Sequence, residues 1–361
     1  MFSFELVFLK KICKPIYLGG LVCLFSAVLV PNFGSAIERG VGAVVINKPK
    51  QSTRTALHNS IEKDDFAVVK KLIDDGADVN AVDGFGLSPL HFAVIKNDVS
   101  LVNLLLSQGA KINVQDKRGD TPIHMIAAAS GSLEITKILL EGGADPNIIN
   151  NKGNTPLHWA AGEGNIVLVQ QLVKSGAKVD VQDISGDTAL HWATEENNQS
   201  IVKYLVIGGA NPNIANKHGR TPLYWAVRRG ALETARFLIV ESGVPANSKG
   251  ISGDTPLHWA AGEGFSSIIK LLSGLTNDID PKAQYGETPL HWAARKGRLM
   301  AATTLIDSGA DKNAVDSLGN TPLTLAQNGG YHDVVELLSP INSIQIEAKL
   351  IHDREINLAL R

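Results

Sequence analysis

The chain has 361 residues, of which 44% are hydrophobic and 19% charged, and its formal net charge is −2. This composition is typical of a folded protein and excludes extensive disorder. The small net charge provides no basic field for nucleic acid or for an anionic membrane. Cys13 and Cys23 are the only cysteines, so the chain beyond them has no thiol for a disulfide, a zinc-thiolate site or a cysteine nucleophile.

Residues 1–36 are predicted to be a secretory signal. A basic stretch with Lys10 and Lys14 precedes an apolar run of 15 residues, 16–30, and small residues lie at the −3 and −1 positions of a cut after Ala36. The run is shorter than the roughly 20 residues of a membrane-spanning helix. We therefore expect cleavage and export, with an uncleaved signal anchor as the alternative; in both cases the basic flank stays cytosolic.

A linker, 37–49, leads into a repeating tetrad that begins with Thr or Ser and occupies 50–340. The tetrads begin at Thr55, Ser88, Thr121, Thr155, Thr188, Thr221, Thr255, Thr288 and Thr321. Spacings of 33 or 34 residues indicate an array of about nine structural repeats. Segment 341–361 contains no tetrad, and it is interpreted either as a terminal cap or as a docking segment.

Each repeat contains the signals of two short helices. Thr or Ser is a preferred N-cap, and the Pro that usually follows suits the first helical position. A second apolar pattern, such as 166–173, follows a Gly or Asn break and predicts an antiparallel partner helix. Gly-Ala pairs such as 176–177 end it, and turns of the form Asp-x-x-Gly follow, as at 183–186. Such a unit buries its apolar face only by stacking on its neighbours, which predicts an all-α solenoid.

The pattern resembles the ankyrin repeat family, whose T-P-L-H-x-A signature is nearly literal at 155–160, 255–260 and 288–293. The resemblance implies a curved stack in which inner helices and hairpin-like fingers form a concave groove. It also implies a non-enzymatic, monomeric protein that binds another protein without a cofactor. No phosphate loop, dinucleotide fingerprint, His-Glu-x-x-His or nucleophile elbow is present.

Several repeats depart from the pattern. Ala189 replaces Pro, Tyr224 replaces His, and Thr324 ends the last tetrad. One extra residue lies near 127–130 and another near 239–242, and the seventh repeat lacks its Gly-Ala pair.

Seven tetrads end in histidine, and a row of histidines suggests a metal site as one hypothesis. The seven are His58, His91, His124, His158, His191, His258 and His291. Equivalent residues of stacked helices lie about 10 Å apart, whereas two ligands of one zinc ion lie within about 4 Å of each other. We therefore predict no metal; the resemblance implies that each histidine hydrogen-bonds the backbone and its tetrad Thr.

Candidate partner-binding residues follow the tetrads. A tryptophan comes directly after five of them, at Trp159, Trp192, Trp225, Trp259 and Trp292. These rings are interpreted as packing with an exposed edge, or as an aromatic recognition stripe. Charged residues one helical turn later are Glu163, Glu195, Glu196, Arg228, Arg229, Glu263, Arg295 and Lys296. They are expected to form either a charge-patterned binding groove or a solvated face with salt bridges between repeats.

The finger tips add a third set of candidates, which are Lys117, Arg118, Asn151, Lys152, Lys217, His218, Gln284 and Tyr285. Reversal of Arg228 and Arg229 together is expected to weaken binding and to leave stability nearly unchanged. The leading hypothesis is an exported, periplasmic or secreted scaffold, similar to ankyrin proteins of host-associated bacteria. The alternative is a membrane-anchored envelope protein that organises or shields its neighbours.

Overall fold

The computed structural model describes residues 54–128 and 132–340, and within these ranges the chain is all-α. It contains 18 α-helices and one π-helical segment there, and no strand. None of the described helices is long and apolar enough to cross a membrane. The predicted signal (1–36), linker (37–49) and C-terminal segment (341–361) lie outside the described residues.

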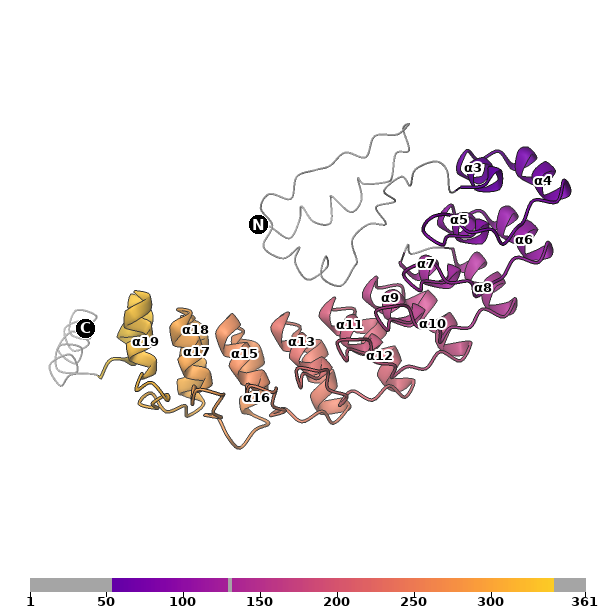
Figure 1. The fold of residues 1–361 in the computed structure, drawn as a ribbon. Helices are drawn as coiled ribbons and strands as arrows, with labels where there is room; N and C mark the ends of the chain where they lie inside the picture. Colours follow the sequence, from indigo (N-terminus) through magenta and orange to yellow (C-terminus); the bar gives the residue numbers. More distant parts are fainter. Residues whose placement is uncertain (1–53, 129–131, 341–361) are drawn as a thin grey trace, which may run out of the picture. The chain divides into compact units, whose positions relative to one another are not determined.

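The helices form nine successive pairs that stack into two layers (Figure 1). The first helices are α3 (Ala56–Glu62), α5 (Pro89–Ile95), α7 (Pro122–Ala128), α9 (Pro156–Gly162), α11 (Ala189–Glu195), α13 (Pro222–Arg228), α15 (Pro256–Glu263), α17 (Pro289–Arg295) and α19 (Pro322–Gly329). The second helices are α4 (Phe66–Asp74), α6 (Val99–Ser107), α8 (Leu133–Glu141), α10 (Ile166–Lys174), α12 (Gln199–Ile207), α14 (Leu232–Arg236) with η2 (Phe237–Glu241), α16 (Ser266–Ser273), α18 (Leu299–Asp307) and α20 (His332–Leu338). Each first helix packs on the first helix of the next repeat, and the second helices pack in the same way. The predicted all-α repeat solenoid is confirmed.

The core runs through the stack because the same tetrad positions are buried in successive repeats. Leu157 and Leu190, third in their tetrads, are fully buried, and so are the alanines Ala160 and Ala193 one turn later. The small alanine side chain lets consecutive first helices approach closely, while leucine fills the space between the two layers.

The tetrad histidine joins each repeat to the next one. Within its own repeat, His158 Nδ1 accepts a hydrogen bond from the Thr155 backbone N–H (N···N 3.1 Å) and contacts Thr155 Oγ1 at 2.9 Å. On the far side of the ring, His158 Nε2 donates to the Asp187 carbonyl at 3.2 Å, 29 residues ahead. Because Nδ1 faces a donor and Nε2 faces an acceptor, the ring is neutral and carries its proton on Nε2.

The same contact, which we call the histidine bridge, recurs with N···O distances of 2.9–3.2 Å. It joins His58 to Leu87, His91 to Asp120, His124 to Asn154, His158 to Asp187, His191 to Arg220, His258 to Glu287 and His291 to Asn320. The hydrogen bonds to Thr and backbone implied by the resemblance are thus present. Because both ring nitrogens are engaged, these histidines have no free nitrogen for a metal ion.

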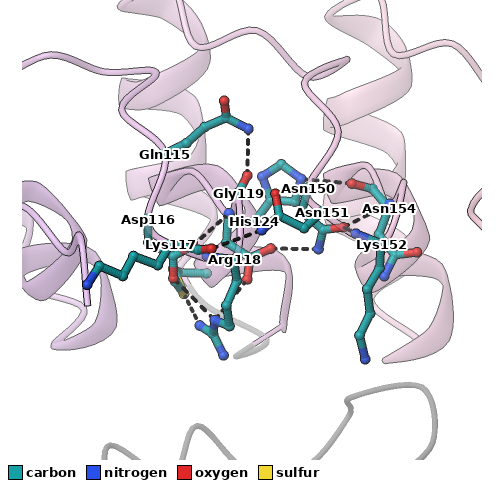
Figure 2. A network of polar contacts seen from close by, with 12 residues as sticks. Gln115, Asp116, Lys117, Arg118, Gly119, His124, Asn150, Asn151, Lys152 and Asn154 are labelled. Atoms are coloured by element: carbon teal, nitrogen blue, oxygen red, sulfur yellow. Dashed lines mark hydrogen bonds and ion pairs between the residues drawn. The ribbon is translucent and has the colours of Figure 1, made fainter. Parts of the chain in front are cut away.

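A finger is the segment between a second helix and the next first helix, and neighbouring fingers hydrogen-bond to one another. The Asn151 backbone N–H donates to the Arg118 carbonyl at 2.8 Å, and the Asn150 amide donates to Asp120 Oδ1 at 2.8 Å (Figure 2). The fingers approach so closely that only glycine fits at some tips. Gly186 has φ +81°, and a Cβ there would lie 2.8 Å from the Lys217 backbone nitrogen.

One of the two extra residues lies in a described segment. The extra residue near 127–130 falls beside or within 129–131, which lie outside the described residues. In the sixth repeat, the extra residue forms the π-helical turn η2, which keeps Phe237 and Leu238 buried. In the seventh repeat, Leu275 follows the cap residue Gly274 and lacks the positive φ of the glycine at the equivalent position of the Gly-Ala repeats, such as Gly176 at +88°.

Loss of one histidine bridge is expected to destabilise the array. In a His158→Ala variant, the Thr155 N–H and the Asp187 carbonyl would both lose a buried partner, which costs about 2–4 kcal/mol of unfolding free energy. Urea unfolding would measure the loss. His218→Ala is the matched control, because His218 is exposed on a finger and a surface change there should cost about 0.5 kcal/mol or less. Equal midpoints for the two variants would contradict the bridge.

The bridges also predict a pH dependence. Burial lowers the pKa of His91, His158, His191 and His258 to about 4, from an ordinary value of 6.5. Between these values the unfolded chain takes up protons that the folded chain does not. The unfolding free energy should therefore be highest above pH 6.5 and fall toward pH 4, by up to about 1.4 kcal/mol per histidine and pH unit. Urea midpoints at pH 7.5 and pH 5 that coincide would refute this.

Candidate protein-binding surface

The five tryptophans lie between consecutive first helices, and their exposure differs. Trp192 is 3% exposed and Trp159 is 9% exposed, whereas Trp225, Trp259 and Trp292 are half-buried. The rings of Trp159 and Trp192 meet edge to face at 5.7 Å, and those of Trp259 and Trp292 meet at 5.1 Å. These positions agree with packing that leaves a ring edge accessible in the later repeats.

Acidic side chains on the fingers hold three of the indole rings. Trp192 Nε1 donates to Asp183 Oδ2 at 3.3 Å, and Trp259 Nε1 donates to Asp254 Oδ2 at 2.6 Å. Trp292 Nε1 donates to Glu287 Oε2 at 2.9 Å. The finger therefore sets the orientation of the ring that follows it, and a partner would meet a pre-organised aromatic edge.

Some of the charged residues after the tryptophans form salt bridges, and others are exposed at helix ends. Lys296 Nζ lies 3.4 Å from Glu263 Oε1 of the preceding repeat, and Arg295 pairs with Glu287 of its own repeat. Glu163 and Glu196 are exposed at the ends of α9 and α11. The expected salt bridges between repeats are therefore present, so part of this face stabilises the stack.

One candidate is not on the surface. Glu195 was expected to share a solvent-facing position with Glu196, but its side chain is only 3% exposed. Arg229 Nη2 of the next repeat lies 3.5 Å from Glu195 Oε1. The prediction of an exposed Glu195 is wrong, because this carboxylate is buried in a contact with the next repeat.

The finger candidates are exposed. Lys117, Arg118, Lys152, Lys217 and Tyr285 are all on the surface. Of these, Arg118 is held in place, because its Nε lies 3.2 Å from Asp116 Oδ2 and 3.4 Å from Asp120 Oδ2 (Figure 2). Tyr285, 60% exposed, presents a large aromatic side chain to solvent. The finger tips thus carry side chains that vary along the array on a common backbone, although Ile-Ser recurs at 184–185 and 251–252.

The junction of the sixth and seventh repeats differs from its neighbours. Tyr224 stands where other repeats have the bridging histidine, and α13 lacks the capping box of the other first helices. The Tyr224 ring instead lies 5.0 Å from the rings of both Trp225 and Trp259, edge to face. The Arg220 guanidinium lies 4.3 Å from the centre of the Tyr224 ring.

Sequence reasoning missed Arg220. The available signal was that arginine stands directly before a tetrad where the flanking repeats have Asp187 and Asp254, next to the Tyr224 departure. Among residues 54–128 and 132–340, there is no group of three or more His, Cys, Asp or Glu residues that could hold a metal ion.

Helix pairs joined by fingers, with a constant core and varied surface residues, define a repeat solenoid built for binding macromolecules. The family described as ankyrin repeats (3 copies) matches residues 34–116, 90–183, 163–250 and 242–316. The chain therefore belongs to the ankyrin repeat family, whose members are in general non-enzymatic and bind other proteins.

Among curated proteins, the chain is similar to "Probable protein S-acyltransferase 23" of Arabidopsis thaliana. The two are 39% identical over 106 residues, which is 28% of this chain and 19% of that relative. The chain thus matches about a fifth of that protein's length, and the matched stretch lies in the repeats.

The Glu195–Arg229 contact corrects the expectation that reversing Arg228 and Arg229 together leaves stability nearly unchanged, because Arg229 pairs with a buried carboxylate. Arg229→Glu should lower the thermal midpoint, because it places a like charge against a buried carboxylate. Since the Arg229 side chain is about a third exposed, we expect a loss of about 1–3 kcal/mol of unfolding free energy. Arg228→Glu is the matched control, since exposed Arg228 contacts the Trp225 ring and hydrogen-bonds the Tyr224 side chain but does not pair with Glu195; we expect its loss to cost about 1 kcal/mol or less of unfolding free energy. Differential scanning fluorimetry compares them, and similar midpoints would show that Glu195 needs no cationic partner.

Proposed function

We propose that this chain is an exported scaffold that binds another protein and carries out no catalysis. The observation that carries the proposal is the division of each repeat into a constant framework and a varied face. The tetrads, bridges and finger backbones repeat along the stack, whereas the helix ends and finger tips carry Glu163, Glu196, Arg228 or Tyr285 in turn. A rigid frame that presents different side chains at regular intervals is suited to recognising a protein surface.

Export rests on the predicted signal. The basic stretch, the apolar run 16–30 and the small residues before Ile37 support translocation across a bacterial-type inner membrane. In this proposal the released array acts outside the cytosol, on proteins of a host. If the signal is not cleaved, the same array would be an envelope protein held at the membrane, where it would organise or shield its neighbours.

Two measurements test the proposal. The mass of the protein recovered from its native compartment should correspond to a chain that begins at Ile37, whereas an intact Met1 would favour the anchored alternative. Cross-linking in that compartment, followed by affinity capture, should recover a protein partner that an Arg228→Glu variant recovers less well. Recovery from the cytosol of the full chain, with no cross-linked partner, would contradict the proposal.

A further inference from the structure

Two arginines converge on one group of aromatic rings at the junction of the sixth and seventh repeats. The Arg220 guanidinium lies 4.3 Å from the ring centre of Tyr224 and 5.7 Å from that of Trp259. The Arg228 guanidinium lies 5.5 Å from the ring centre of Trp225 and 5.9 Å from that of Trp259. We call these five residues the arginine–aromatic cluster. Both guanidinium groups thus lie within cation–π distance of the rings.

The backbone of the cluster is fixed from the preceding repeat. His191 Nε2 donates to the Arg220 carbonyl at 3.1 Å, and the Arg220 N–H donates to Asn216 Oδ1 at 3.1 Å. At the following junction the bridge is absent, because Tyr224 replaces histidine. A small, partly open depression lies there between the two fingers, lined by Arg220, Tyr224 and Asp254 among others.

Basic residues are concentrated at this junction. Residues 217–229 contain Lys217, Arg220, Arg228 and Arg229 and no acidic residue, in a chain whose net charge is −2. Of these, Arg229 is paired with Glu195. Within 54–128 and 132–340, neither Arg220 nor Arg228 forms an ion pair. Asp254 also lines the depression, where its carboxylate accepts from Trp259 Nε1, and Glu263 pairs with Lys296.

We propose that the arginine–aromatic cluster binds carboxylate side chains of an acidic segment of a protein partner. Guanidinium groups donate pairs of parallel hydrogen bonds to carboxylates, and they do so best when their planes are already oriented and partly desolvated. The half-buried Trp225 and Trp259 edges supply apolar contact for the stems of the bound side chains. This inference rests on the proposed binding function and assigns it a site and a ligand chemistry.

The test uses the full chain and a fluorescein-labelled peptide of alternating Glu and Gly, with a Gln-Gly peptide as the uncharged comparison. Fluorescence anisotropy should show binding of the Glu peptide alone, weakened by added salt. Arg220→Gln and Arg228→Gln should each raise its Kd about tenfold, the loss expected for one charge-assisted contact. Arg236→Gln is the matched control, because Arg236 is exposed on α14 in the second layer.

Thermal midpoints show whether each variant is folded. If Arg220→Gln does not fold, Arg228→Gln alone tests the inference. Equal affinity for the two peptides would overturn the inference. So would an Arg228→Gln variant that binds the Glu peptide as tightly as the parent, or an Arg236→Gln variant whose affinity falls as far as that of the cluster variants. If the peptide test fails but cross-linking still captures a protein partner, this site alone is rejected. Loss of peptide binding in the cluster variants, with no partner captured, would instead reject the proposed function.

Discussion

The stack depends on the histidine bridge, in which one neutral imidazole closes the cap of its own helix and holds the finger of the next repeat. Both nitrogens are satisfied by backbone groups, so the contact does not depend on which side chains the next finger carries. This separates stability from recognition. The finger tips and helix ends can change from repeat to repeat while the backbone that presents them stays in place.

Among the described repeats, the junction of the sixth and seventh is the one that lacks a histidine bridge, and the arginine–aromatic cluster lies at this junction. Between the sixth and seventh repeats, the finger backbones still meet, because the Ile251 N–H donates to the His218 carbonyl at 3.1 Å. The tyrosine in place of histidine contacts two tryptophans and lies under Arg220 instead of reaching the next finger. The ninth repeat also lacks histidine, but there Thr324 completes the helix cap of Thr321.

Most of the framework could be predicted from sequence, because its signals are local. A Thr cap, a Pro at the first helical position and a Gly-Ala ending each act within a few residues of their own position. The site could be predicted only in part, because its contacts join residues about 34 positions apart. Glu195 and Glu196 are alike in sequence, yet one is the last helical residue, buried against Arg229, and the other is the exposed cap. Arg220 acquires its surroundings only when Trp259 of the next repeat packs beside it.

The most direct test of the account is nitrogen-15 NMR of the imidazole rings in the folded chain at neutral pH. The seven tetrad histidines should be neutral and carry the proton on Nε2, with Nδ1 unprotonated. For His91, His158, His191 and His258, whose pKa is lowered to about 4, these signals should persist as the pH is lowered toward 5 for as long as the chain remains folded. Cationic rings, or the tautomer protonated on Nδ1, would contradict the bridge and with it the account of how the repeats are joined.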